Sequence, residues 1–149
     1  MDRKEFLKTC GFACLGITGL GAVLQGCHPS KILSGRIEGS DLVIPVADFD
    51  MPDEKQPLSK KYKKYVVIQN DALQFPICLF RLSPTEYSAL LMKCPHQGAE
   101  LQVFGEKLQC PAHGSEFDQK GIVQSAPADV NLRSFPVLID NLHLKISLK

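Results

Sequence analysis

The sequence predicts an all-β domain of antiparallel strands, on the basis of three observations. Short apolar runs rich in β-branched residues recur from Asp41 onward, and loops rich in Pro, Asp and Ser separate them. The last run alternates between apolar and polar residues. The chain has 149 residues, enough for one hydrophobic core, so we expect a single antiparallel all-β domain over residues 41–149.

The expected strands follow one another along the chain. The β-branched run at 42–46 comes first, and further short runs occupy 63–69, 77–82, 87–93 and 135–139. After the turn Asp140-Asn141, the apolar residues Leu142, Leu144, Ile146 and Leu148 alternate with polar ones. This alternation predicts one buried face and one solvent face in the last strand. His143 falls on the solvent face, which predicts a surface histidine rather than a ligand.

Two short loops carry the most specific chemistry in the chain. Each contains one thiol and one imidazole, in the sequences Cys94-Pro95-His96 and Cys110-Pro111-Ala112-His113. Two thiolates on one iron and two imidazoles on the other form a mixed-ligand [2Fe-2S] centre, whose potential exceeds that of an all-cysteine cluster. The prolines stiffen both loops, and glycines at 98 and 114 permit turns that a side chain would hinder. Backbone amides are then free to point at cluster sulfurs.

These loops resemble those of the Rieske iron–sulfur family, whose pattern is C-x-H, a spacer, then C-x-x-H-G. The resemblance runs from about Val66 to Leu148, and the segment 124–128 is similar to the proline loop that covers the cluster in that family. It implies a Rieske-type sandwich with a small cluster-binding subdomain at about 93–128. Pro127 would cover the cluster, and Ser115 would donate a hydrogen bond to a cluster sulfur. The implied metal ligands are Cys94, His96, Cys110 and His113.

The chain departs from the family pattern at three positions. Quinol-oxidising members carry an additional cysteine in each ligand loop and bridge the two by a disulfide, whereas the matching residues here are Ala99 and Ala112. Phe117 stands where those members place a tyrosine. In lacking the disulfide the chain resembles the ferredoxin-type members of the family. In having a serine at position 115 it resembles the members of higher potential. We therefore expect a midpoint between the ends of the range of roughly −150 to +300 mV.

The resemblance implies a one-electron carrier without substrate chemistry of its own, working with a redox partner protein. His96 and His113 are the candidates for partner docking and electron exit. Three alternatives stay open: a subunit of a quinol-oxidising complex, a ferredoxin-like subunit of an oxygenase, and a zinc-binding structural module. An oxygenase acting alone would need a second iron held by two histidines and a carboxylate. The two remaining histidines, His28 and His143, lie at opposite ends of the chain.

The N-terminal residues resemble an export signal. A charged segment at 1–8 precedes an uncharged stretch from Thr9, and the stretch ends in Leu24-Gln25-Gly26-Cys27. This ending resembles the lipobox of bacterial lipoproteins, in which the signal is cleaved before the cysteine. We expect a signal over 1–26, a lipidated Cys27 with a linker over 27–40, and anchoring in the bacterial cell envelope facing the periplasm or exterior. The alternative is a retained membrane helix.

Residues 3–8, Arg-Lys-Glu-Phe-Leu-Lys, also resemble a twin-arginine signal with lysine in the second arginine position. That route would export the protein already folded around its cluster.

Composition narrows the possible partners. Without residues 1–26 the chain loses three of its 17 basic and two of its 16 acidic residues, so its net charge becomes about zero. A neutral domain argues against nucleic acid as a partner.

A lysine-rich stretch at 55–64 is interpreted as a solvated loop before a strand. Cys78, in an apolar run, is expected to be a buried thiol, and no disulfide is expected within the exported domain.

Overall fold

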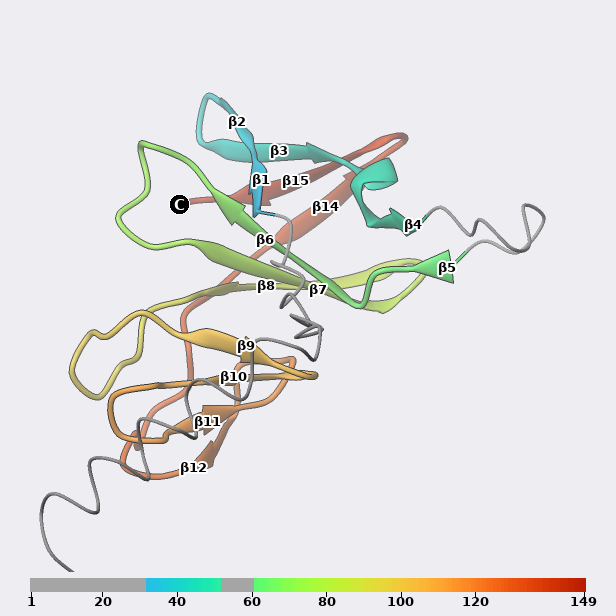
Figure 1. Ribbon diagram of the computed structural model, residues 1–149. Coiled ribbons are helices and arrows are strands. Elements are labelled where there is room, and N and C mark those ends of the chain that lie inside the picture. The colour runs from blue at the N-terminus through green and yellow to red at the C-terminus, as the bar shows by residue number, and fades with distance from the viewer. Residues whose placement is uncertain (1–31, 52–60) are drawn as a thin grey trace, which may run out of the picture.

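The computed structural model describes residues 32–51 and 61–149, which form strands and one short 3-10 helix, η1 (Val46–Phe49) (Figure 1). No α-helix occurs in these ranges, so the all-β, mainly antiparallel fold is confirmed. Figure 1 shows the sheets stacked in three tiers, with β2, β3, β14 and β15 above, β6, β7 and β8 in the middle, and β9 to β12 below.

The central sheet has the strand order β1-β6-β7-β8-β13. Its strands are β1 (Ile32–Ser34), β6 (Tyr65–Gln69), β7 (Ile77–Ser83), β8 (Glu86–Leu91) and β13 (Ser134–Phe135). β1 runs parallel to β6, and the other neighbours are antiparallel. Because successive side chains point to opposite faces, β7 sends Ile77 and Leu79 into one core and Cys78 and Phe80 into another. The sheet is therefore buried on both sides.

The first core lies between the central sheet and a four-stranded antiparallel sheet. That sheet has the order β14-β15-β3-β2, formed by β14 (Val137–Asp140), β15 (His143–Ser147), β3 (Asp41–Pro45) and β2 (Arg36–Glu38). Leu42, Ile44, Leu144 and Ile146 face the core and are at most 1% exposed. Burial of side chains of this size favours folding by about 1.5–3 kcal/mol each.

The second core joins the central sheet to a smaller antiparallel sheet. Its order is β12-β11-β10-β9, with β9 (Gln102–Phe104), β10 (Lys107–Gln109), β11 (Glu116–Phe117) and β12 (Val123–Ser125). Leu101, Leu108 and Phe117 from this part pack with Phe80 and Leu90 of the central sheet. A further pair, β4 (Asp50–Met51) and β5 (Lys61–Tyr62), lies beside the central sheet.

The structure corrects three details of the sequence interpretation. Residues 32–38 were expected to belong to a linker, but they form β1 and β2 and pair with both large sheets. Leu142 is 74% exposed because it lies in the β14–β15 turn, so the buried face of the last strand begins at Leu144. The run 135–139 divides at Pro136, and β13 and β14 join different sheets.

Other expectations are confirmed. Asn141 has a positive φ of 51° in the turn between β14 and β15, and His143 is exposed. Cys78 is fully buried, and burial raises the pKa of its thiol. Among the described residues Cys78, Cys94 and Cys110 are free thiols, and the expectation of no disulfide in the exported domain stays a prediction. The expected signal, Cys27, the linker up to residue 31 and lysines 55 and 60 lie outside the described residues. In the described ranges, no helix has the length and apolar character needed to cross a membrane.

Candidate metal centre

The two cysteine–histidine loops are built on one backbone plan. In the first loop the amide of Cys94 donates to the carbonyl of Ala99 at 2.8 Å, and the amide of Gly98 donates back to Cys94 at 2.8 Å. The second loop has the same pair of hydrogen bonds. The amide of Cys110 donates to the carbonyl of Ser115 at 2.8 Å, and the amide of Gly114 donates to the carbonyl of Cys110 at 2.9 Å. Gly98 and Gly114 have φ of 75° and 81°, a region that L side chains rarely adopt.

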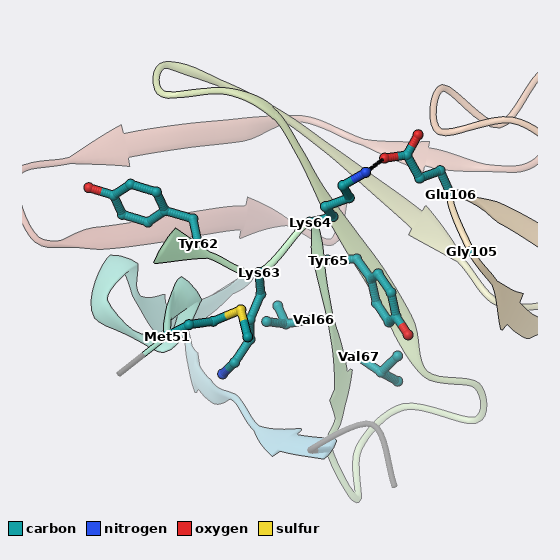
Figure 2. Close-up of a pocket in the computed structure, with 9 residues that line it drawn as sticks. All are labelled: Met51, Tyr62, Lys63, Lys64, Tyr65, Val66, Val67, Gly105 and Glu106. Atoms are coloured by element: carbon teal, nitrogen blue, oxygen red, sulfur yellow. Dashed lines mark hydrogen bonds and ion pairs between the residues drawn. The ribbon is translucent and has the colours of Figure 1, made fainter. Parts of the chain in front are cut away.

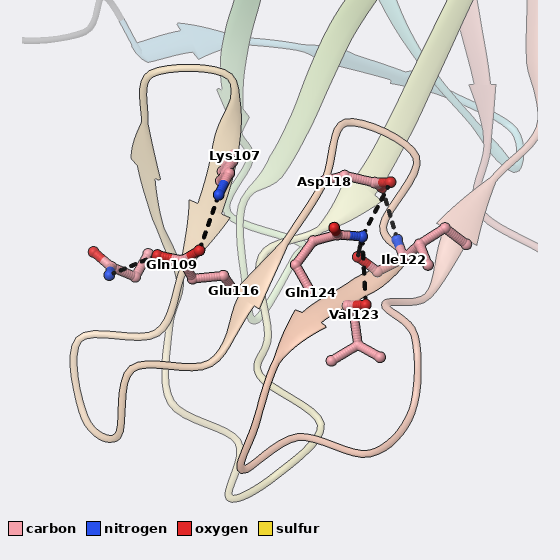
Figure 3. A network of polar contacts seen from close by, with 7 residues as sticks. All are labelled: Lys107, Gln109, Glu116, Asp118, Ile122, Val123 and Gln124. Carbon is pink, nitrogen blue, oxygen red and sulfur yellow. Dashed lines mark hydrogen bonds and ion pairs between the residues drawn. The ribbon is translucent and has the colours of Figure 1, made fainter.

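Strand pairing closes each loop at its base. Lys93 pairs with Glu100 in an isolated antiparallel bridge, and Gln109 pairs with Glu116 between β10 and β11. Figure 3 shows Glu116 accepting hydrogen bonds from Gln109 at 3.3 Å and from Lys107 at 3.1 Å. Each cysteine therefore begins a closed turn whose two ends are tied to each other.

The two thiols meet inside the second core, where both Cys94 and Cys110 are 1% exposed. Their side chains hydrogen-bond to each other. Burial raises the pKa of the Cys94 thiol, although the amides of His96 and Gln97 donate to its sulfur. Burial also opposes ionisation of Cys110, but hydrogen bonds from the amides of His113 and Ala112 outweigh it and lower the pKa of this thiol. Backbone amides thus donate to the cysteine sulfur in both loops, whereas their expected donation to the sulfurs of a cluster stays a prediction.

The two imidazoles also meet. The rings of His96 and His113 have centroids 5.0 Å apart and an interplanar angle of 87°, an edge-on contact. His96 is half-buried and His113 is exposed. Nδ1 of His96 is buried and has no hydrogen-bond partner in the protein. A buried nitrogen without a partner costs free energy, and a metal ion is a partner that satisfies an imidazole nitrogen.

The four side chains therefore fit a [2Fe-2S] cluster of mixed ligation. They form a pair of thiols and a pair of imidazoles, and a Rieske cluster takes two sulfur ligands on one iron and two nitrogen ligands on the other. Within the described part of the chain, no three His, Cys, Asp or Glu side chains converge on a position for a single ion.

Ser115 links the second loop to the returning proline segment. Its side chain is completely buried, and its Oγ accepts a hydrogen bond of 3.0 Å from the amide of Ala128. This contact holds residue 128 against the loop, next to the exposed Pro127. The hydroxyl proton of Ser115 is still available for another acceptor.

A second polar network supports the returning segment from the other side. Oδ1 of Asp118 accepts from the amides of Lys120 at 2.8 Å and Ile122 at 2.9 Å, and Gln124 donates to Oδ2 at 3.5 Å (Figure 3). The amide of Gly121 donates to the carbonyl of Asp118 at 3.0 Å and closes a tight turn at 118–121. No sequence pattern indicated the contact between Ser115 and Ala128 or the partnerless nitrogen of His96.

A cavity of about 500 Å³ lies away from these loops. Figure 2 shows Met51, Tyr62 and Tyr65 around it, with an ion pair between Lys64 and Glu106 at its rim. The guanidinium of Arg81 lies over the ring of Tyr62 at 3.8 Å. None of the lining residues belongs to a cysteine–histidine loop, so this cavity is not part of the candidate metal centre.

The family model of the Rieske [2Fe-2S] domain matches residues 51–136. This range covers more than half of the chain and includes both loops, so the chain belongs to the Rieske [2Fe-2S] family. Its cofactor is accordingly a [2Fe-2S] cluster, and the zinc-binding alternative is set aside. Rieske domains of this kind are electron carriers.

Particular relatives extend the comparison. The chain is 40% identical over 76 residues to the oxygenase component of dicamba O-demethylase from Stenotrophomonas maltophilia, and 43% identical over 49 residues to methylxanthine N1-demethylase NdmA from Pseudomonas putida. These matches cover 44% and 31% of this chain, but only 22% and 14% of the relatives.

Among solved structures, the plasma membrane Rieske protein PetC3 from Synechocystis PCC 6803 matches with a TM-score of 0.50 and 22% identity. The match covers 56% of this chain and 86% of that protein. At this identity the likeness shows the fold alone.

Proposed function

We propose that this protein is a membrane-tethered one-electron carrier whose cluster is held by Cys94 and Cys110 on one iron and by His96 and His113 on the other. The observation that carries the proposal is the buried, partnerless Nδ1 of His96 beside the contacting ring of His113. The adjacent buried thiols of Cys94 and Cys110 complete the ligand set.

A bound cluster of this ligation gains or loses one electron within a range of about −150 to +300 mV. The residues around the cluster determine its midpoint potential within this range. Amides of His96, Gln97, Ala112 and His113 donate to the cysteine sulfurs and favour the more negative, reduced state. Ser115 is fixed by the amide of Ala128 with its hydroxyl proton free to donate in the same way.

The proteins that exchange electrons with this chain would dock at the exposed side of the imidazole pair. His113 is exposed, whereas both thiols are buried, so the histidine side offers the shorter path to a partner. Pro127 is exposed beside this region and would shield the sulfur side from water.

Electron paramagnetic resonance of the dithionite-reduced, full-length holoprotein tests the ligand assignment. We expect a mixed-ligand [2Fe-2S] signal in the parent protein, with nitrogen couplings from two histidines. His96→Cys should remove one nitrogen coupling. Two nitrogen couplings that persist in this variant would refute the assignment of His96.

The tether is proposed from residues 24–27, where Leu-Gln-Gly precedes Cys27. Labelling cells with a radioactive fatty acid tests it, with Cys27→Ser as the variant and Cys78→Ser as the matched control. We expect label and membrane association in the parent and the control, and neither in Cys27→Ser. A variant that still pellets with membranes but lacks label would favour the retained helix.

A second candidate function is a ferredoxin-like subunit of an oxygenase. Two observations favour it: the matched relatives are named demethylases, one of them an oxygenase component, and alanine occupies both positions of the loop disulfide. A subunit of a quinol-oxidising complex is favoured instead by Ser115. Stopped-flow reduction by a ubiquinol analogue, compared with reduction by an oxygenase reductase, separates these two functions.

A further inference from the structure

A cavity of about 280 Å³ lies beside the first ligand loop and is lined by two cations and two phenylalanines. Nζ of Lys93 lies 5.3 Å from the ring centre of Phe75, and the guanidinium carbon of Arg133 lies 4.8 Å from that of Phe135. These distances place each cation within range of a cation–π interaction. Three leucine side chains contribute to the remaining wall.

Strand register explains why these residues share one cavity. The amide of Leu91, at the end of β8, donates to the carbonyl of Arg133 at 2.9 Å, so Arg133 lies opposite Leu91 directly before β13. Lys93 follows two residues after Leu91 and continues on the same face. In Figure 1 the β6–β7 loop, which contributes Phe75, lies on the same side of the molecule as the β8–β9 loop, which contributes Lys93.

Both cations lack an acidic partner in the structure. Among the described residues, neither Lys93 nor Arg133 is in an ion pair, and no carboxylate lines the cavity. Glu100 pairs with Lys93 through the backbone but does not line the cavity. Two positive charges that line one cavity without a counter-charge make its potential positive, and an anion bound there would be attracted by both.

We propose that this cavity binds a small organic carboxylate with an apolar body. The carboxylate would lie between Lys93 and Arg133, because a guanidinium presents paired donors that match carboxylate geometry. The apolar body would lie against Phe75, Phe135 and the leucines, which an inorganic anion would not use. The cavity volume suits a molecule about the size of benzoate.

Binding at this position would be linked to the cluster, because Lys93 directly precedes the ligand Cys94. Reduction adds negative charge, so the carboxylate should bind the reduced protein more weakly than the oxidised protein. By reciprocity the carboxylate should lower the midpoint potential. Each tenfold difference in affinity corresponds to about 59 mV for a one-electron couple. This linkage rests on the electron-carrying function proposed above, whereas binding itself does not.

Calorimetric titration of the oxidised, full-length holoprotein with benzoate at constant ionic strength tests the binding. We expect saturable one-site binding that weakens at least tenfold in Lys93→Gln and in Arg133→Gln, and that Lys93→Arg largely restores. Lys64→Gln, which removes a lysine charge away from the ligand loops, should bind like the parent. Benzamide, the neutral analogue of the same shape, should not bind.

Three results would overturn the proposal: no saturable binding of benzoate, equal binding of benzamide, or unchanged binding in both charge variants. A blocked peptide with a single glutamate tests whether an acidic side chain of a partner is the true occupant. If it binds tighter than benzoate at the same two residues, the free acid is the wrong ligand. Redox titration with and without benzoate then tests the linkage separately, since an unchanged midpoint would leave the binding result intact and refute only the coupling.

Discussion

The first ligand loop, residues 94–99, and the second, residues 110–115, are made by the same backbone hydrogen bonds but differ in what they carry. In the first, the histidine is two residues after the cysteine, and in the second it is three residues after. His96 is half-buried and its Nδ1 is buried without a partner, whereas His113 is exposed. The same turn geometry thus holds one imidazole partly inside the protein and the other at its surface.

The last residue of each turn differs as well. Ala99 ends the first turn, and Ser115 ends the second. Ser115 is tied to the amide of Ala128, so the second loop alone is joined by a side chain to the proline segment. The backbone hydrogen bonds therefore give both loops the same turn, and the side chain at the last residue determines whether a loop also contacts the proline segment.

The largest effect should come from removing either thiol. Cys94→Ala and Cys110→Ala should each lose essentially all iron and acid-labile sulfide, because each iron has only two protein ligands. Cys78→Ala, in the same core, should keep the full cluster and lose about 1–2 kcal/mol of stability through the small cavity left behind. Iron and sulfide analysis of the purified proteins checks this. A full complement of iron in either loop variant would show that the loops are not equivalent in holding metal.

The shared backbone predicts equal costs at the two loop glycines. Gly98→Ala and Gly114→Ala should each lose about 1–2 kcal/mol, because alanine is strained at positive φ. Gly39 has a φ of 63° and, like Gly114, open space where a Cβ would lie. Gly39→Ala is therefore the control: it should lose a similar amount of stability without changing the midpoint potential of the cluster. Urea unfolding of the holoproteins measures these values. A loss of stability in only one of Gly98→Ala and Gly114→Ala would show that the two turns do not depend on their glycines in the same way.

The difference between Ala99 and Ser115 should appear in the potential. If Ser115 donates to the cluster as proposed, Ser115→Ala removes a donor that favours the reduced state, and a hydrogen bond worth about 1 kcal/mol corresponds to roughly 40 mV for one electron. The midpoint should therefore fall by about that amount, and the buried amide of Ala128 should lose its acceptor. Ser125→Ala, an exposed serine in β12, is the matched control and should leave the midpoint unchanged. Redox titration that finds the same midpoint in Ser115→Ala and the parent would show that Ser115 does not tune the cluster.

The smallest effect should come from an ion pair far from both loops. A hydrogen bond from Lys145 at 2.6 Å and the charge of its ammonium lower the pKa of Asp140. A depressed carboxyl pKa stabilises the fold above the unfolded value near 3.9, and this contribution disappears as pH falls through the folded value. Asp140 is exposed and Lys145 partly exposed, so solvent screens the pair and the melting temperature of Asp140→Asn should match that of the parent at pH 7. A clear drop that vanishes at pH 3 would contradict this.

Much of the candidate site could be predicted from local sequence because its proposed ligands lie in two short loops. Cys94 and Cys110 begin turns whose prolines and glycines are visible in the sequence, and the alternation of Leu144 and Ile146 predicts the buried face of the last strand. Residues 32–38 were misread as linker because each strand there has only three residues, too short for a periodic signal. Their strand character depends on pairing with β6 and β3.

The amino-acid sequence alone determined the class of fold and the family, and it singled out the four proposed ligands, since these depend on residue type and on spacing within a few residues. The tertiary structure decided which nitrogen is buried without a partner, which amide Ser115 accepts, and that Lys93 and Arg133 face one cavity. These are contacts between residues distant in sequence, and their geometry is set only when the sheets pack against one another.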